Sequence, residues 1–474
     1  MNIELLTGPR SRRLHAAVDR ETLECLRRAR QVRFGLTPVD VRELPGTQRR
    51  VVATAPGPMR IPGKRWRLHL AEADGTVTLG PVIAIFTSSY RRDPRRRFAS
   101  LSGRFRRFVQ HARELGALAY VFTPRGVHWR QKMITGFTWV GSGKRGRWVR
   151  GSFPFPNVVY NRVPTRKAEQ RPRVSAVRQR LLEYPELHLF NPKFLDKWQV
   201  YQILRRVEGV REHLPETRLY TRVADLLPFL QRHEHVYLKM ASGSLGRGTA
   251  RIDLLNDGKM RWRATRPGRQ IAARLLSGRK ELEAQMRRLS RRGKYLMQQG
   301  ISLLKANGRP FDVRALVQKE PNGRWTVTGM AARIAGPRQI TTHRPRGGSR
   351  AQLSPLIQTV FRNPQSASRV EEELRRVIVQ AAEAFDRETG GGHGELSMDV
   401  AIDGNGHPWV LELNAKPAVF DEPAIRRQAE RRLLNYCFAR SGFRVPGADA
   451  ADPSAAGPGL GTPPAAPDFS AYPL

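Results

Sequence analysis

The chain has 474 residues, and its 84 Lys and Arg against 41 Asp and Glu give a formal net charge of +43. That length exceeds one compact core, and 40% hydrophobic residues suffice to bury several. No apolar run approaches a membrane span, and the N-terminus lacks the apolar core of a signal peptide, so we expect a soluble, cytoplasmic protein. Cys25 and Cys437 have no metal-binding spacing, and reduced thiols are expected rather than one long-range disulfide.

The excess of cations favours an anionic partner such as a nucleic acid or an acidic polypeptide. The arginines are spread along the whole chain, however, which also fits a basic protein that has no such partner. Composition alone leaves both interpretations open.

The N-terminal third is predicted to hold two domains. Residues 1–78 alternate polar and apolar side chains between Gly and Pro breaks, which predicts a β-rich domain. In residues 79–175, apolar runs at 81–89 and 117–124 flank a helical pattern that ends at Gly116, and this βαβ order predicts a parallel sheet. The stretch "NVVYNRVP" predicts another strand, and a basic helical stretch follows it.

Residues 180–445 have an α+β pattern and are predicted to form the largest domain. Helices are expected at "KFLDKWQVYQILRRV", "GRKELEAQMRRLSRRG" and "SRVEEELRRVIVQAAEAFDRETGG", and a strand at "KYLMQQGI". Three hairpins are expected: "HVYLKMA" with "TARIDLL", "PFDVRALVQKE" with "RWTVTGMAARIA", and the two halves of "HGELSMDVAIDGNGHPWVLELNAKP". Residues 446–474, rich in Pro, Ala and Gly, are predicted to be disordered.

The last hairpin carries candidate metal ligands. Glu412 and Asn414 are two residues apart and therefore share one face of their strand, and Asp399 lies across the turn. Two carboxylates and an amide oxygen are hard donors that suit Mg²⁺ bridging substrate phosphates. The alternative is that this is simply the polar outer face of the hairpin.

The loop "SGSLGRG" in the first hairpin is a candidate phosphate loop. Its glycines let backbone N–H groups converge on one cluster of oxygens, and Lys239 just before it would add a point charge. No Gly-Lys-Ser/Thr follows, so it is not a Walker A loop, and a flexible hairpin turn is the alternative.

Three further cations stand near apolar strands or helix starts. Lys197 begins a helix, where a solvated lysine is the ordinary interpretation. Arg314 and Arg333 lie on strands with apolar neighbours, and an arginine that faces a cleft needs an anionic partner. For Arg314, Asp312 on the same face could supply that partner structurally.

The order of these motifs resembles the ATP-grasp superfamily, in which two α+β subdomains clamp ATP. "NPKFLDKWQVYQIL", "HLPET", "VYLKMASGSLGRGTARI", "YLMQQGISLL", "GRPFDVRALVQ", "VTGMAARIA" and "LELNAKP" together look like the YheC/YheD-type endospore coat-associated ATP-grasp proteins. The resemblance covers residues 30–440. It implies an ATP-grasp fold of mixed α+β and α/β character, preceded by a small parallel-sheet domain and a β-rich segment.

The resemblance also implies roles for individual residues. Arg314 and Arg333 would act in catalysis by steadying the γ-phosphate or an acyl phosphate, and Asp399, Glu412 and Asn414 would hold Mg²⁺, with Mn²⁺ as a substitute. The residues expected to bind ATP are Lys197, Lys239, Ser242, Gly243, Ser244, Gly246, Gly248, Gln298, Gln299 and Ile301.

Two positions depart from the family pattern. Beyond the hinge, where an acidic residue commonly holds the ribose, the chain has only Lys305 and Asn307. His343 stands where an asparagine is expected, and a surface histidine is an alternative to a substrate contact.

The resemblance implies an ATP- and Mg-dependent carboxylate–amine ligase that acts through an acyl phosphate, in spore coat formation. Its substrate would be an amino acid or an acidic peptide, and its location the mother-cell cytoplasm or the spore coat. An ATP-binding structural or regulatory coat protein without ligase activity is the alternative. Nucleic-acid binding ranks third because no recognised module for it is present.

Overall fold

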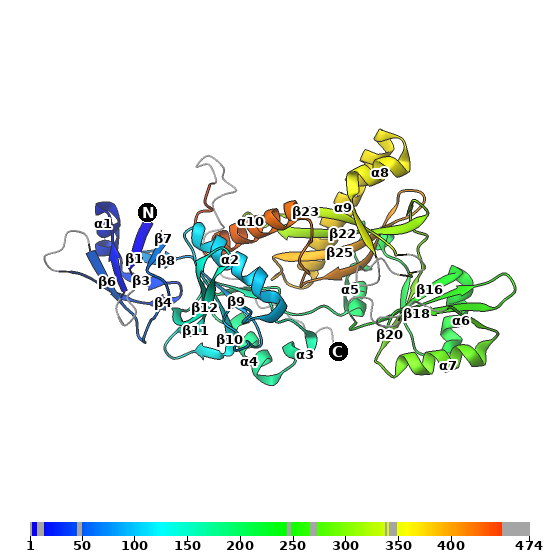
Figure 1. Cartoon of the computed structure of the whole chain (residues 1–474), viewed down its shortest axis with the longest axis horizontal. Coiled ribbons are helices and arrows are strands. Elements are labelled where there is room, and N and C mark those ends of the chain that lie inside the picture. Colours follow the sequence, from blue (N-terminus) through cyan, green and yellow to red (C-terminus); the bar gives the residue numbers. More distant parts are fainter. Residues whose placement is uncertain are drawn as a thin grey trace.

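The computed structural model describes residues 2–6, 14–44, 50–243, 248–265, 273–336, 339–340 and 348–447. Within these ranges the chain forms four β-sheets. The sheet of residues 2–80 lies at one end of the long axis and the sheet of residues 217–299 at the other, with the other two sheets between them (Figure 1). Most of the predicted C-terminal tail, and His343, Ser244 and Gly246, lie outside the described residues. No helix in the described ranges combines the length and apolarity needed to cross a membrane.

The first sheet is built from residues 2–80, with strand order β4-β3-β8-β7-β1-β2-β6-β5. Alternation buries one face, so that Ile3, Leu5, Trp66 and Leu68 lie in the core. The helix α1 (Arg20–Arg28), which Asp19 caps by accepting from the Thr22 N–H, was not predicted. The strands are β1 (Asn2–Leu6), β2 (Leu14–Ala17), β3 (Gln31–Phe34), β4 (Thr37–Pro38), β5 (Asp40–Glu43), β6 (Arg50–Thr54), β7 (Arg65–Ala73) and β8 (Thr76–Gly80).

The second sheet confirms the predicted βαβ unit. The strands β9 (Val82–Phe86) and β10 (Leu118–His128) pair in parallel, and α2 (Ser102–Glu114) forms the crossover. The order β12-β11-β10-β9-β13-β14 adds β11 (Met133–Ser142), β12 (Arg145–Pro154), β13 (Val158–Asn161) and β14 (His188–Phe190). The carboxyl ends of β9, β13 and β14 share one edge, because all three strands are parallel. The loop and the short helix α3 (Arg166–Glu169) that follow β13 therefore leave from that edge, and α4 (Pro172–Leu182) comes next.

The third sheet, of order β15-β20-β16-β17-β18-β19, contains the first predicted hairpin. Its members are β15 (Thr217–Leu219), β16 (His235–Met240), β17 (Ala250–Leu254), β18 (Met260–Ala264), β19 (Ala273–Leu276) and β20 (Tyr295–Gln299). The helices α6 (Val223–His233) and α7 (Arg279–Ser290) cover one face (Figure 1), against which Val236 and Leu238 of β16 are buried. The opposite face of β16 therefore carries Tyr237 and Lys239.

The fourth sheet contains the other two predicted hairpins, both confirmed, in the order β24-β23-β22-β25-β26. Its strands are β21 (Lys305–Ala306), β22 (Arg309–Lys319), β23 (Trp325–Ile334), β24 (Ser349–Gln352), β25 (Glu395–Ile402) and β26 (Pro408–Asn414). The helices α5 (Lys197–Leu204), α8 (Leu353–Phe361) and α9 (Pro364–Glu388) share its core, in which Leu374, Val377 and Ile378 of α9 are fully buried.

The helix α10 (Pro423–Arg440) joins the fourth sheet to the second. Its residues Leu434, Tyr436 and Phe438 are buried in the same core as Phe105 and Phe190 of the second sheet region. Cys437 on this helix and Cys25 are both buried and free, as expected for reduced thiols. The strand β14 at 188–190 pairs with the second sheet, although the predicted boundary of the last domain falls at 180.

A buried charge cluster also fixes this junction. Glu395 of β25, 1% exposed, accepts hydrogen bonds from the Tyr160 hydroxyl, from Arg104 at 3.2 Å and from Arg162 at 3.4 Å. Arg104 and Arg162 also donate to the Pro417 carbonyl at 2.9 and 3.0 Å. A buried carboxylate needs such partners, so the two arginines are fixed in place by Glu395. Through their hydrogen bonds to Pro417 they attach the segment that directly follows β26 to the second sheet region.

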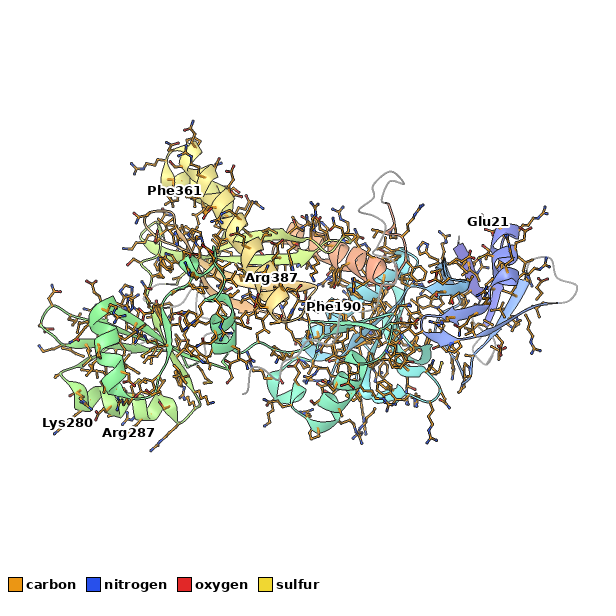
Figure 2. All side chains as sticks on the ribbon, turned by 180° about the vertical axis from the view of Figure 1, so that it is seen from behind. Glu21, Phe190, Lys280, Arg287, Phe361 and Arg387 are labelled. Atoms are coloured by element: carbon orange, nitrogen blue, oxygen red, sulfur yellow. The ribbon has the colours of Figure 1, made fainter. Side chains whose placement is uncertain are left out.

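Phe190 offers a test of the junction, because it lies in the interior near the middle of the molecule (Figure 2). It stacks on Tyr160 with ring centroids 4.8 Å apart and meets Tyr436 edge-on at 5.4 Å. We expect Phe190→Ala to lower the free energy of unfolding by about 3–5 kcal/mol, measured by urea denaturation. The control Leu275→Ala, at a side chain 55% exposed, should change it by less than about 0.5 kcal/mol. Equal effects of the two variants would contradict the assigned packing.

Candidate active site

The hairpin of β25 and β26 places two carboxylates opposite each other. Asp399 pairs with Glu412, and Ser397 pairs with Asn414, so that Glu412 and Asn414 share a face as predicted. A β-bulge begins directly beside them, because Val400 pairs with Val410 and leaves Leu411 unmatched. Asp399, Glu412 and Asn414 all line one cavity of about 480 Å³.

Two arginines reach Asp399 from neighbouring strands. Arg314 of β22 donates to Asp399 Oδ1 at 2.7 Å and to Ser397 Oγ at 3.1 Å. Arg333 of β23 contacts Asp399 Oδ2 at 2.9 Å and holds Asp312 in a bidentate pair at 2.8 and 3.0 Å. The sequence had suggested Asp312 as a structural partner of Arg314, whereas the structure gives that role to Asp399. Burial opposes the charge of Arg333, but the attraction of Asp399 and Asp312 outweighs burial and raises its pKa.

Lys197 connects Glu412 to the glycine loop. It is the first residue of α5, after the N-cap Asp196, and its Nζ lies 3.0 Å from Glu412 Oε1. The same Nζ donates to the Gly243 carbonyl at 2.6 Å, and the Lys197 N–H donates to the Ala241 carbonyl at 3.1 Å. Its side chain is only 15% exposed, so the solvated lysine considered from the sequence is wrong.

Lys239 and Gln298 form a second polar pair on the third sheet. Lys239 Nζ donates to Gln298 Oε1 at 2.5 Å, and Gln298 Nε2 donates to Thr217 Oγ1 at 3.0 Å. Burial lowers the pKa of Lys239 from 10.5 to about 8, although Glu412 draws it upward. An anion bound next to this buried amine would stabilise its protonated form and raise its pKa again.

Lys197, Lys239, Gln298 and Glu412 border a second, much smaller pocket between the third and fourth sheets. Its other lining residues are apolar: Val200, Tyr201, Leu204, Leu214, Leu296, Val410, Leu411 and Leu413, with Thr217 as the exception. Its volume of about 30 Å³ matches one water molecule. Glu412 lines both this pocket and the 480 Å³ cavity, so the two hollows meet at its carboxylate.

Two other residues predicted to bind ATP, Gln299 and Ile301, line neither of these two hollows. Gln299 turns its Oε1 to the Glu216 N–H at 3.0 Å. Ile301 lines a separate cavity of about 270 Å³ with Tyr237, Arg251 and Lys305, the residue considered for the ribose. Ser242 lines the large cavity, and Gly248, at φ +72°, has the left-handed backbone that favours glycine.

Sequence reasoning missed a group of further residues that line the large cavity. They are Thr165, Arg166, Lys167, Phe194, Arg350, Lys416, Asp421 and Glu422. Lys416 follows the Glu-x-Asn pair by two positions, and its ion pair with the buried Glu169 spans 247 residues. No local pattern signals a contact of that separation.

Metal-binding chemistry at the hairpin depends on mixed donors. Among the residues that the structure describes, no group of three or more His, Cys, Asp and Glu side chains could hold a metal ion. The expected set differs in kind, because it combines two carboxylates with the Asn414 amide. Both carboxylates already contact cations, so a bound metal would compete with Lys197 and the two arginines.

Two α+β sheets that meet across a lysine pair and a carboxylate hairpin define an ATP-grasp protein. A family model described as YheC/D like ATP-grasp matches residues 186–439, more than half of the sequence, and the chain belongs to that family. The endospore coat-associated protein YheD of Bacillus subtilis (strain 168) is 29% identical over 377 residues, which are 78% of this chain and 81% of YheD. YheC of the same organism is 23% identical over 271 residues, covering 57% and 73% of the two chains.

Solved structures of ATP-grasp ligases are also similar to this chain. The ligase PsnB, complexed with a phosphomimetic variant of its minimal precursor, Mg and ADP, has a TM-score of 0.43 at 16% identity and covers 76% of this chain and 99% of its own. The D-alanine–D-alanine ligase from Bacillus anthracis has a TM-score of 0.44 at 10% identity, with coverages of 76% and 97%.

The lowered pKa of Lys239 predicts a pH dependence of stability. Free lysine binds its proton up to about pH 10.4, whereas Lys239 in the folded protein releases it near pH 8. The unfolded chain therefore binds more protons in this window, and the stability contributed at Lys239 rises with pH from about 8 to 10.4. The melting temperature of the wild type minus that of Lys239→Met should rise over this range. The control Lys280→Met changes an exposed lysine on α7 (Figure 2), and parallel curves for wild type and Lys239→Met would contradict the prediction.

Proposed function

We propose that the protein is an ATP- and Mg-dependent ligase that joins a carboxylate to an amine through an acyl phosphate. The observation that carries this proposal is one cavity of about 480 Å³ that brings Arg314, Arg333, Asp399, Glu412 and Asn414 together. Cations and hard oxygen donors on one wall are what phosphoryl transfer to a carboxylate requires.

The reaction proceeds in two balanced steps. A carboxylate oxygen of the substrate attacks the γ-phosphorus of ATP, the bond to the β-phosphate oxygen breaks, and ADP leaves. An amine then attacks the acyl carbon and loses a proton, and phosphate leaves with the oxygen that had belonged to the carboxylate. Arg314 and Arg333 both line the cavity, and we assign to them the binding of the transferring phosphoryl group and of the developing oxyanion.

The lysines would bind the phosphates of ATP from the opposite side. Lys197 and Lys239 both border Glu412, and the low pKa of Lys239 favours an arriving polyanion because the anion stabilises the charged amine. Ser242, Gly243 and Gly248 belong to the loop that would close over the phosphates, and Ser244 and Gly246 are assigned to the same loop from the sequence. Gln298, Gln299 and Ile301 are proposed to border the base.

The donor set fits Mg²⁺. Asp399 and Glu412 face each other across the hairpin, and Asn414 adds a neutral oxygen, so three hard donors line the large cavity. When bound, Mg²⁺ or Mn²⁺ neutralises phosphate charge during transfer. Asp399 would then give up part of its contact with Arg314 and Arg333 in favour of the metal ion. Both guanidinium groups would thereby become available to the substrate.

The names of the relatives suggest a place of action. YheD and YheC are described as endospore coat-associated, and we propose a role for this protein in spore coat formation, in the mother-cell cytoplasm or the coat. We also propose the division into domains 1–78, 79–175, 180–445 and a tail 446–474. The second candidate, an ATP-binding coat protein without ligase activity, predicts ATP binding without turnover.

The direct test is ADP release with Mg-ATP over a panel of amino acids and acidic peptides. ADP that appears only when both a carboxylate and an amine are supplied supports the ligase. Normal ATP binding with no ADP from any pair would favour the non-catalytic coat protein.

Glu412→Gln tests the hairpin within the active protein. Removing the charge while keeping the shape should lower kcat at least 100-fold, because both the metal site and the contact with Lys197 lose their anion. The matched control is Glu372→Gln at an exposed position on α9, which should leave kcat within twofold. Unchanged turnover in Glu412→Gln would contradict the site assignment.

A further inference from the structure

We propose that the wall formed by residues 164–167 and Phe194, called the α3 wall below, binds a second carboxylate of the substrate. The substrate would then be a dicarboxylate, such as a glutamic acid residue that is free or within a peptide. The inference rests on the proposed ligase function, because it takes the other carboxylate as the one activated at Arg314 and Arg333.

The α3 wall lines the same cavity as the proposed metal and phosphate residues, but it comes from a different sheet region. Pro164, Thr165, Arg166 and Lys167 follow β13 at the carboxyl edge of the second sheet, and they line the same cavity as Asp399 and Glu412 on the fourth sheet. The cavity is thus shared between two sheets, and its volume of about 480 Å³ suits a small ligand rather than a phosphate alone.

Among the described residues, neither cation of this wall, Arg166 or Lys167, forms an ion pair, and Arg166 is the more buried of the two. It donates to the Leu195 carbonyl, its guanidinium lies over the Phe194 ring at 5.5 Å, and no ion pair is formed by it within the described part of the chain. Burial lowers its pKa, while Asp196, Glu169 and Glu412 act on it only through longer-range attraction. A half-buried guanidinium with donors to spare favours an anionic ligand.

The cations that line the cavity outside the α3 wall already have carboxylate partners. Lys416, 2% exposed, forms an ion pair with Glu169, which is itself held by the Phe194 N–H at 2.9 Å. Arg350 contacts Asp421 at 3.0 Å and Glu422 at 3.3 Å. Arg314 and Arg333 bind Asp399, as described above. The charge that a second substrate carboxylate would meet is therefore that of Arg166, with Lys167 beside it on the rim.

A dicarboxylate could contact both groups of arginines that line the cavity. One carboxylate placed at Arg314 and Arg333 can accept the phosphoryl group, and the second can form a bidentate pair with Arg166 while the connecting methylenes pass the Phe194 ring. A monocarboxylate would leave Arg166 unpaired. The alternative occupant of Arg166 is a phosphate of ATP, and the experiment separates the two.

The test is calorimetric binding to the whole protein with Mg-ADP present, and it does not require turnover. Glutarate, butyrate and a capped Glu-Glu dipeptide are titrated into wild type, Arg166→Ala, Arg166→Lys and the control Arg173→Ala, an exposed arginine on α4. We expect Arg166→Ala to weaken glutarate about 10- to 100-fold and butyrate less than twofold, with Mg-ADP and Mg-ATP affinity unchanged and partial recovery in Arg166→Lys.

Each other outcome is decisive. Equal affinities of wild type for glutarate and butyrate, or equal losses for both in Arg166→Ala, would overturn the inference. Weaker Mg-ATP binding with unchanged glutarate binding would assign Arg166 to phosphate instead. Tighter binding of the dipeptide than of glutarate would identify a peptide as the source of the carboxylate. Failure of the ligase itself is distinct, since it appears as absent ADP release whatever the binding results.

Discussion

The site depends on one carboxylate, Asp399, which is held between two arginines and directly opposite a second carboxylate. Arg314 and Arg333 come from two successive strands, and the cross-strand register places both on the face that carries Asp399 and Glu412. Two neighbouring carboxylates or an unpaired arginine at partly buried positions would each destabilise the fold. Because cations and anions alternate on this face, each charge has an opposite partner. In the proposed reaction, the same two arginines and two carboxylates would act on the phosphorylated substrate.

From this centre the contacts run outward to the other sheets. Glu412 reaches the glycine loop through Lys197, and the Glu395 cluster fixes the segment after β26 to the second sheet. The pocket between Lys239, Gln298 and β26 holds little more than a water molecule, so the two ATP-grasp sheets are in close contact here. The proposed binding of a nucleotide between them would require the third sheet to separate from the fourth, and the hydrogen bond from Lys197 to the Gly243 carbonyl would have to change.

Sequence reasoning was sufficient wherever the pattern was local. The spacing of two residues placed Glu412 and Asn414 on one face of their strand, and the β9-α2-β10 unit followed from its apolar runs. The sequence did not predict which carboxylate each arginine contacts. Asp312 lies opposite Arg333 and Asp399 lies opposite Arg314, and these pairs depend on how three strands align. The pair of Lys416 with Glu169 was missed because it joins segments 247 residues apart. Arg166 was missed because its place in the cavity depends on how the second and fourth sheets meet and not on a local pattern. Ile301 was grouped with Lys239 by family pattern, whereas in this conformation it borders a different cavity.

The central claim is that the residues around Asp399 transfer a phosphoryl group from ATP to a carboxylate. The most direct measurement uses a substrate whose carboxylate is labelled with ¹⁸O, followed by mass spectrometry of the inorganic phosphate released. An acyl phosphate intermediate predicts one ¹⁸O atom from the carboxylate in each phosphate formed together with the amide. Phosphate without the label would contradict the account, because ATP would then be cleaved without the carboxylate ever receiving its phosphoryl group.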